Sequence, residues 1–546
     1  MKADNLSNSE SITENTEKTA PSLESMRVAK PVKNAKIFAG VTFISRILGL
    51  FRDATAAAFF GINMIWDVFV IAFILPNLFR RLFGEGSLSA ALIPAYSEKK
   101  EKEGPDAANK LFSATLTFTI LIMSAITLLI IIIIICIPTD ALANLLNSSD
   151  KIEKAELLKI LIPILIPFLI LICTSAIFNG ILNVHGRFAL PAAVPVFLNI
   201  FWIAALFVGA YFLKLDDRDL VIFMCIGIIS GVLFAIILQI ILLRKSKVFF
   251  SINFKLRDSG AIEVFRKMLP MLLGLGILQL NILIDNLIAE IFVDGSGAVS
   301  SLYYGNRLMQ FPLALIGVAL GVAVFPLLSK LAAKNDIEGL SANASRIFSV
   351  SLFLSIPAAT GLILLNEEIV KILFMRKEFD IVAVQRTSNI VLFYACGLFA
   401  TILIQLVTRV FYAVKDTKTP VKIAVYVVFL NIILNLILVH TPMKEAGLAL
   451  ATSISAVVNV VFLFIVLRKR LKINFDFIYG LFRTIAITAV MGSLLIIYLH
   501  LTKDLLQPGF ISLLIQVIGG ILISSIIYAV LSFYFNRTEL KNILRN

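Results

Sequence analysis

The sequence has little of what enzymes and metalloproteins use. Its 546 residues include 3 His and 4 Cys, and only 15% are charged. The four cysteines stand singly in apolar segments, without the paired spacing of zinc sites or disulfide frameworks: Cys136, Cys173, Cys225 and Cys396. The chain also has no nucleotide-binding GxxxxGK(S/T) loop and no Ser/His/Asp set in a soluble domain. We therefore expect no enzyme activity and no resident cofactor.

Polar stretches are scarce too, except in residues 1–35, which are rich in Ser, Thr, Glu and Lys and are expected to form a disordered cytoplasmic tail. Hydrophobic residues make up 59% of the chain, and the mean hydropathy is +0.95. A water-soluble domain of this length needs no such excess for its core. Apolar runs of about twenty residues recur from Ile37 to Tyr534, each long enough for a helix to cross about 30 Å of hydrocarbon. The composition predicts an all-α integral membrane protein.

Fourteen transmembrane helices are predicted, and the basic residues between them indicate the orientation. Connections after even-numbered helices hold most of the Lys and Arg, whereas 61–66 and 292–299 hold none. Because cytoplasmic loops collect Lys and Arg, both termini are expected in the cytoplasm, and the net charge of +14 indicates topology rather than nucleic-acid binding. The predicted helices lie near 37–60, 67–97, 107–138, 156–184, 190–212, 219–244, 264–292, 299–330, 344–366, 384–412, 420–440, 446–467, 476–500 and 510–534.

Two exterior loops carry more basic residues than this topology predicts. We interpret them as amphipathic segments that lie on the outer surface of the membrane. Their basic residues are Lys151, Lys154 and Lys159 in one loop, and Lys371, Arg376 and Lys377 in the other.

A weak repeat appears when the chain is displaced along itself by about 230 residues, which aligns 187–191 (RFALP) with 416–420 (DTKTP). Such a repeat is typical of transporters built from two homologous bundles. The predicted organisation is a tail, a six-helix N-lobe, an amphipathic linker on the cytoplasmic surface, a six-helix C-lobe, and two further helices with a short tail. The corresponding ranges are 1–35, 36–245, 246–263, 264–470 and 471–546.

Ionisable residues inside the predicted helices are the most informative. Four arginines lie near mid-membrane, where each would cost about 2.5–3.5 kcal/mol if it faced lipid: Arg46, Arg52, Arg80 and Arg307. They are therefore expected to face a hydrated cavity. Asp53, seven residues from Arg46 on one helical face, and the i,i+4 pair Arg81 and Glu85 are interpreted as structural ion pairs. The remaining arginines outnumber the nearby acids, and the forked guanidinium suits phosphate oxygens, so an anionic ligand is indicated.

The predicted C-lobe holds few charges, and Asp285 is the most conspicuous. Asn431 and Asn435 lie on one face of helix eleven, and Thr452 on helix twelve could add a hydroxyl. These oxygen ligands would suit a sodium ion with Asp285 as the counter-charge. Hydrogen bonding between polar side chains of neighbouring helices explains the same pattern equally well.

Four segments closely resemble the MurJ (MviN) family of lipid II flippases, in the same order along residues 36–535: SRILGLFRD at 45–53, PNLFRRLFGEG at 76–86, LNVHGRF at 182–188 followed by Pro191 and Pro195, and YYGNRLMQFP at 303–312. The resemblance implies two six-helix lobes in a V shape, with two extra helices forming a hydrophobic groove that leads to a central cavity. It implies undecaprenyl-pyrophosphate-linked disaccharide pentapeptide (lipid II) as the substrate. It also implies a set of substrate-binding residues: Arg46, Arg52, Arg80, Arg307, Asp67 and Asn77.

The sequence departs from the family pattern at two positions. Asn306 stands where members often carry Asp before the arginine of helix eight, which would make the cavity more cationic. Asn435 replaces a carboxylate of the sodium site that some relatives have.

The resulting hypothesis is a monomeric flippase of the bacterial inner membrane that moves lipid II outward by alternating access for cell-wall synthesis, with membrane lipids as its surroundings. Sodium or the membrane potential would supply the energy, because no nucleotide site is present. The alternatives are an ion-coupled multidrug exporter, a flippase for another polyprenyl-linked glycan, and a scaffold that docks cell-wall enzymes. A drug exporter favours an acid-lined cavity, the reverse of this charge pattern.

Overall fold

The computed structural model describes residues 23–536 except 147–149, 256, 258–259, 472–476, 506 and 508, and this described part of the chain is helical without strands. Part of the predicted tail, 1–22, lies outside the described residues. The first helix begins at Leu23, so it includes thirteen residues of the stretch for which disorder was expected, 23–35. The predicted linker has no regular secondary structure over 248–255, where the backbone N–H groups of Ser251 and Asn253 donate to the hydroxyl oxygens of Ser113 and Thr117.

A first bundle comprises the helices that precede this linker, and they pack mainly against one another. They are α1 (Leu23–Phe60), α2 (Met64–Phe79), η1 (Arg80–Ser87), α3 (Leu88–Lys102), α4 (Pro105–Cys136), α5 (Thr139–Ala143), α6 (Lys151–Leu165), α7 (Phe168–Val184), α8 (Ala189–Phe207), η2 (Val208–Phe212) and α9 (Asp217–Lys245).

A second bundle follows the linker. Its helices are α11 (Ala261–Phe292), α12 (Ala298–Pro312), η3 (Leu313–Val318), α13 (Ala319–Ala333), α14 (Ile337–Leu364), α15 (Asn366–Phe374), α16 (Ile381–Cys396), α17 (Leu398–Ala413), α18 (Lys418–Leu438) and α19 (Glu445–Leu471). The segments written η are π-helical. Helix α11 packs against α3 and η1 of the first bundle as well as against α18 of the second.

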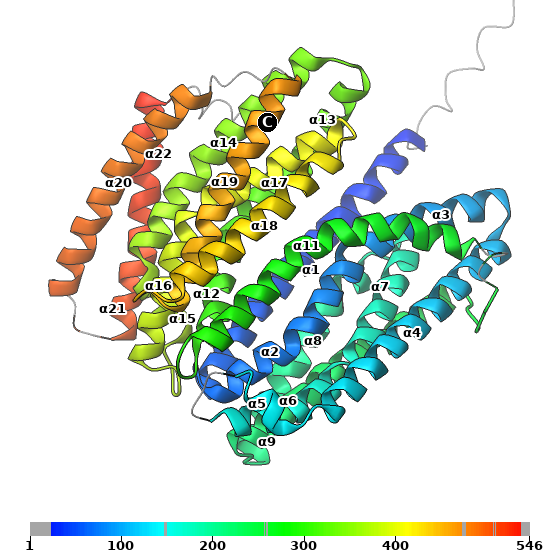
Figure 1. Ribbon diagram of the computed structural model, residues 1–546. Helices are drawn as coiled ribbons and strands as arrows, with labels where there is room; N and C mark the ends of the chain where they lie inside the picture. The colour runs from blue at the N-terminus through cyan, green and yellow to red at the C-terminus, as the bar shows by residue number, and fades with distance from the viewer. Residues whose placement is uncertain are drawn as a thin grey trace, which may run out of the picture.

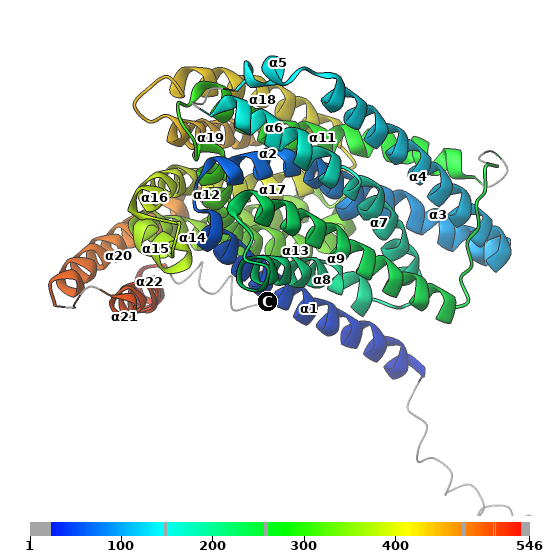
Figure 2. The same ribbon diagram turned by 90° about the horizontal axis from the view of Figure 1, so that it is seen from below.

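Three segments are appended to the second bundle: α20 (Phe477–Leu505), then α21 (Phe510–Leu514), and α22 (Gly520–Phe535), which continues α21 through η4 (Ile515–Gly519). Helices α20 and α22 lie at the edge of the molecule beside α14 (Figure 2). Tyr528 of α22 is buried there and donates its hydroxyl to the backbone oxygen of Phe353 on α14 (2.7 Å).

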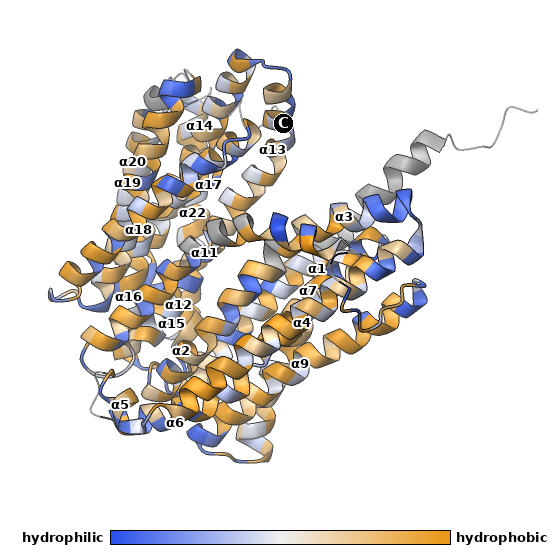
Figure 3. Cartoon of the chain, turned by 45° about the vertical axis from the view of Figure 1, so that its right-hand side comes forward, coloured by the Kyte–Doolittle hydropathy of each residue, from blue (hydrophilic) through white to orange (hydrophobic). Residues whose placement is uncertain are grey.

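The two bundles meet at one end of the molecule and diverge toward the other (Figures 1 and 3). At the joined end, α2 packs against α12 and α1 packs against α15. The divergent end carries α3 and α13, whose last turns contain Lys99, Lys100 and Lys102, and Lys330. Hydrophobic residues cover most of the helical surfaces in Figure 3, and hydrophilic residues gather near helix ends and connections.

The fourteen expected apolar segments are all helical in the structure. Among the described residues, ten helical segments are long and apolar enough to cross a membrane, and the pair α16 and α17, bent by 45°, adds an eleventh as one span. The other three expected segments correspond to α1, to the run from α2 to α3, and to α11. The all-helical membrane fold is therefore confirmed, and the total of fourteen spans stays a prediction.

Candidate substrate site

A guanidinium and a carboxylate adjacent in sequence form the centre of the candidate site. Arg52 of α1 is 8% exposed and donates through Nε and Nη2 to Oδ1 of Asp53, at 3.0 and 2.6 Å. Its Nη1 donates to the amide oxygen of Asn199 on α8 (3.0 Å), and its guanidinium lies 4.4 Å from the ring centroid of Trp202. Packing of α8 against α1 therefore fixes the direction of this cation.

The same carboxylate reaches across to the second bundle. Arg307 of α12 lies with Nε 3.3 Å from Oδ2 of Asp53. Tyr303, one helical turn earlier, donates its hydroxyl to Oδ1 of Asp53 (2.9 Å) and accepts a hydrogen bond from Nη2 of Arg307 (3.1 Å). Residues of α1 and α12, separated by about 250 positions, thus form one polar group between the bundles.

Arg46 lies six residues before Arg52 on α1 and is exposed. It makes no hydrogen bond or ion pair with any residue of the described part, so the expected pairing of Arg46 with Asp53 is wrong. Asp53 is a structural ion-pair residue as expected, but its partners are Arg52 and Arg307. One carboxylate therefore pairs with two guanidinium groups, while a third on α1, that of Arg46, has no partner among the described residues.

Arg80 begins the π-helical segment η1, four residues after Pro76 within α2. Its Nε donates to the amide oxygen of Asn77 (3.0 Å). Arg81 donates through Nη1 to Gln279 of α11 (3.3 Å), a contact between helices that the sequence did not predict. The side chain of Glu85 lies outside the described residues, so its predicted pairing with Arg81 stays a prediction. Wide turns of this kind often occur at functional sites because they redirect side chains.

Asp67 was predicted to contact substrate, but it lies elsewhere in this structure. It is 1% exposed near the start of α2 and accepts hydrogen bonds from the first turn of α12. The donors are the backbone N–H of Gly297 (2.5 Å), the backbone N–H of Ser300 (2.8 Å) and the hydroxyl of Ser300 (2.6 Å). A carboxylate at a helix N-terminus is stabilised by the helix dipole and by the otherwise unpaired N–H groups. Asp67 therefore joins the two bundles and does not face an open cavity.

The burial of Lys154 contradicts the interpretation of its loop as an amphipathic segment on the outer surface of the membrane. Its side chain is 1% exposed, and Nζ lies 2.7 Å from Oε1 of Glu290 on α11 and 3.9 Å from Oδ2 of Asp67. Lys151, by contrast, is exposed as expected. In the second of the two basic exterior loops, Lys377 is exposed, but its Nζ donates to the hydroxyl oxygen of Tyr211 of the first bundle (2.7 Å). Lys377 therefore belongs to the joined end.

The predicted sodium ligands do come together. Asn435 donates through Nδ2 to Oδ1 of Asp285 (2.6 Å) and to Oδ1 of Asn431 (2.9 Å). Asn281, one turn before Asp285, donates to its Oδ2 (3.2 Å). Thr452 donates its hydroxyl to the backbone oxygen of Leu448 (3.0 Å). Of these hydrogen bonds, the one from Asn435 to Asp285 joins two helices, α18 and α11, as the second interpretation of the pattern predicts, and the others lie within single helices.

The residues that the sequence did not single out are mostly tertiary partners. Tyr303 lies inside the quoted motif at 303–312 and could have been found there, since a tyrosine one turn before a buried arginine can hydrogen-bond to it. Asn199 and Trp202 are on α8, and no feature of that apolar segment indicates contact with Arg52.

Comparison with known proteins identifies the family of this chain. The family model for the lipid II flippase MurJ matches residues 56–517. A probable lipid II flippase MurJ from Rickettsia prowazekii (strain Madrid E) is 32% identical over 493 residues, covering 89% of this chain and 94% of the relative.

Solved structures give the same result. A structure of the lipid II flippase MurJ in an inward closed conformation has a TM-score of 0.74 at 28% identity, covering 92% of this chain and 99% of that one. An inward-facing multidrug transporter of the MATE family in the MOP superfamily has a TM-score of 0.62 at 14% identity over 80% of this chain and 98% of that one, a likeness of fold alone. The extent of the family match and of the curated relative's identity shows that the chain belongs to the MurJ family of lipid II flippases.

Proposed function

We propose that this protein moves lipid II, the prenyl-diphosphate-linked precursor of peptidoglycan, from the inner to the outer leaflet of the bacterial inner membrane. Membership of a flippase family, and not of a catalytic enzyme family, supports transport. The observation that carries the substrate class is the sharing of one carboxylate, Asp53, by Arg52 and Arg307, while Arg46 on α1 has no hydrogen bond or ion pair within the described part of the chain. A diphosphate would supply the missing negative charge.

The chemistry of binding follows from the guanidinium group. Each guanidinium offers several coplanar N–H donors and can hold two phosphate oxygens at once, an arrangement stronger than a single hydrogen bond between neutral groups. Arg52 and Arg307 each retain donors beyond those engaged by Asp53, Asn199 and Tyr303. Arg46, and Arg80 beside Asn77, would add positive charge along the path of the headgroup.

The arrangement of the bundles supports alternating access. The basic turns at the divergent end, together with the excess of Lys and Arg in the corresponding loops, support a cytoplasmic location for that end and for both termini. In this state the headgroup would enter from the cytoplasmic side, while contacts such as Asp67 with Ser300 keep the exterior side closed. Rocking of one bundle against the other would then expose the headgroup outside. Since each bundle contributes to one shared group, a monomer is sufficient.

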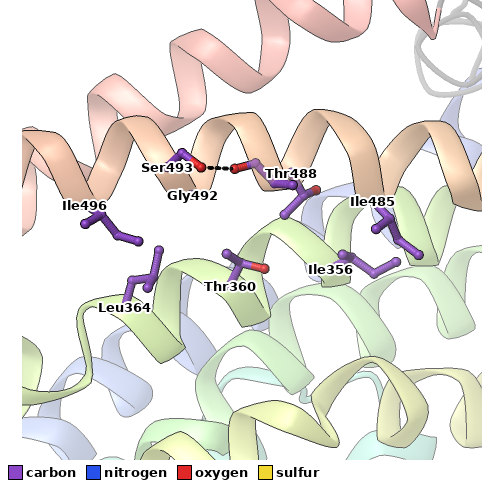
Figure 4. A pocket seen from close by; sticks show the side chains of 9 residues that line it. Ile356, Thr360, Leu364, Ile485, Thr488, Gly492, Ser493 and Ile496 are labelled. Atoms are coloured by element: carbon purple, nitrogen blue, oxygen red, sulfur yellow. Dashed lines mark hydrogen bonds between the residues drawn. The ribbon is translucent and has the colours of Figure 1, made fainter.

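An apolar groove between α14 and α20 could hold part of a lipid chain. It has a volume of about 330 Å³ and is lined by Ile356, Thr360, Leu364, Ile485, Thr488, Ala489, Gly492, Ser493 and Ile496. Figure 4 shows its aliphatic side chains facing one another between the two helices, with Gly492 leaving room at the middle. This volume suits only a segment of a prenyl tail, so the rest of the tail would lie in the bilayer.

Energy would come from the membrane potential or from sodium. The donor set of Asp285, Asn431, Asn435 and Thr452 suits sodium, and the buried Oδ1 of Asn435 has no hydrogen-bond partner in the described part of the structure. Rotation of the Asn435 amide would bring this oxygen toward Asp285, where a cation would hold both. A dependence of flipping on sodium that Asp285→Asn abolishes supports this coupling; flipping that follows only the imposed potential assigns the energy to the potential.

The proposal is tested with purified protein in vesicles that contain fluorescent lipid II. Arg52→Ala and Arg307→Ala should each lower the flipping rate by at least about tenfold, since each removes charge-assisted hydrogen bonds worth about 1.5–3 kcal/mol. Arg218→Ala is the matched control, because Arg218 is 39% exposed and lies 3.8 Å from Glu156 at the surface. Full activity of both cavity variants would refute the proposed substrate site.

A further inference from the structure

Three ionisable side chains from three helices meet at the joined end, away from the arginines. They are Asp67 of α2, Lys154 of α6 and Glu290 of α11, and their side chains are 1%, 1% and 4% exposed. Two of them, Asp67 and Lys154, belong to the first bundle, and Glu290 lies in the last turn of α11, a helix of the second bundle. The buried ammonium group of Lys154 therefore has two carboxylates as possible ion-pair partners, and it cannot pair equally closely with both.

The distances show how the partners are divided. Lys154 contacts Glu290 at 2.7 Å but lies 3.9 Å from Asp67. Asp67 is satisfied instead by three hydrogen bonds from Gly297 and Ser300 of α12. Both strong contacts therefore cross from the first bundle to the second, whereas the long contact joins two residues of the same bundle.

Separation of the bundles at this end would break both strong contacts at the same time. Asp67 would lose the first turn of α12, and Lys154 would lose Glu290. An uncompensated charge in a water-poor site is strongly unfavourable. Asp67 and Lys154 would remain next to each other, because α2 packs against α6 within the first bundle. A shift of about 1 Å would convert their long contact into a direct hydrogen bond.

We propose that Lys154 is a positioning residue that exchanges ion-pair partners during transport, binding Glu290 while the exterior side is closed and Asp67 once it opens. Each state then keeps Lys154 paired, and Glu290 is hydrated at the newly opened surface. The exchange lowers the cost of parting the bundles without weakening the closed contact. This inference rests on the proposed alternating access, and it assigns to Lys154, Asp67 and Glu290 a role in gating and none in substrate contact.

The test measures the separation of the bundles directly. Spin labels are placed at the exposed positions Lys214 and Lys444, on the joined ends of the first and second bundles, after the four native cysteines are replaced by Ala. Pulsed electron–electron double resonance then gives the distribution of distances between the two spin labels in vesicles without substrate. Since no lipid II is present, this readout does not depend on the identity of the substrate.

Glu290→Gln removes the closed-state partner of Lys154 but keeps Asp67 for the separated state. The population with a long label distance should therefore rise about tenfold. Glu156→Gln is the matched control on α6, because Glu156 is 52% exposed and lies 3.8 Å from Arg218 at the surface. It should leave the distribution unchanged. An unchanged distribution in Glu290→Gln would overturn the proposal.

A charge reversal separates partner exchange from a fixed ion pair. The double variant Lys154→Glu with Glu290→Lys restores an ion pair across the bundles but places two carboxylates side by side at 154 and 67. Partner exchange predicts that the short label distance returns while flipping of lipid II stays below a tenth of the unmodified rate. Recovery of both the distance and the flipping rate would show that Lys154 serves Glu290 alone and would overturn the exchange. Loss of flipping in Arg52→Ala together with these results would leave the substrate proposal intact.

Discussion

Asp53 competes with the proposed substrate for the same two arginines. Removing its charge is therefore predicted to lower the stability of the substrate-free protein and to strengthen diphosphate binding. Its side chain is 5% exposed, and it contacts Arg52 at 2.6 Å and Arg307 at 3.3 Å across the two bundles. Asp53→Asn keeps the shape of the side chain but removes its charge. The substrate-free protein should become less stable, because the two guanidinium groups then repel each other with only a neutral amide between them. Binding of a diphosphate should become tighter, because the internal competitor is gone.

The magnitude follows from the contacts. Hydrogen bonds to charged groups contribute about 1.5–3 kcal/mol each, and the side chain of Arg307, 25% exposed, is screened by solvent more than the side chain of Arg52, 10% exposed. We expect a gain of about 1–2 kcal/mol in diphosphate binding, which is about a five- to thirtyfold lower dissociation constant. Turnover should fall, because the headgroup leaves a more cationic site more slowly.

The assay is thermal unfolding of purified protein with increasing undecaprenyl diphosphate. A ligand that binds only the native state stabilises it in proportion to the logarithm of its concentration over the dissociation constant. Asp53→Asn should therefore begin at a lower melting temperature and show the larger rise on addition of ligand. Asp219→Asn, at an exposed position in the first turn of α9, is the control. Weaker diphosphate binding in Asp53→Asn than in the unmodified protein would refute the competition.

Two further predictions concern packing. Gly297→Ala should open the joined end and lower the melting temperature, because a Cβ there would lie 2.3 Å from the backbone oxygen of Ile62 in the first bundle. Gly295→Ala is the control, since Gly295 has a similar positive φ of +85° but a Cβ there would meet nothing within 4 Å. It measures the loss of stability of about 1 kcal/mol that comes from the strained backbone alone. If both variants open the joined end equally, the contact with Ile62 does not hold it closed. Tyr528→Phe should cost about 1 kcal/mol in thermal unfolding through loss of its bond to Phe353, whereas Tyr534→Phe, at 65% exposure, should cost nothing measurable.

The sequence predicted the helices well, because twenty apolar residues in a row have few other stable arrangements in lipid. The interruptions were harder to predict. The change from α2 to the π-helical η1 at Arg80, and the break near 166–167 between α6 and α7, depend on how prolines and glycines are accommodated by neighbouring helices. Pro76, Pro163 and Pro167 are visible in the sequence, but whether each bends, widens or ends a helix is decided by packing.

The free-energy cost of a charged side chain in lipid identified the ionisable residues within the membrane, but it could not assign their partners. It selected Arg52 and Arg307 as residues that should not face lipid, and in the structure both lie against Asp53. It missed Lys154, because that residue stands near the polar start of α6, where a lysine usually reaches water. The partner Glu290 is 136 positions away, and no local pattern indicates that the two meet.

The polar cluster around Lys154 and the polar cluster around Asp53 differ in how completely their charges are paired. This difference distinguishes the proposed gate from the proposed binding site. At the joined end, each carboxylate and the lysine has a close partner, so a ligand would have to displace an existing contact. Around Asp53, one carboxylate faces two arginines, and Arg46 makes no hydrogen bond or ion pair with the described residues, so an anion would meet positive charge that is not yet neutralised. Because a buried charge is costly until it is paired, the incomplete set favours ligand binding and the complete set favours a closed protein interface. Both sets bridge the two bundles, so filling the first with a diphosphate loosens the hold of Asp53 on Arg307 and thereby lowers the cost of parting the second.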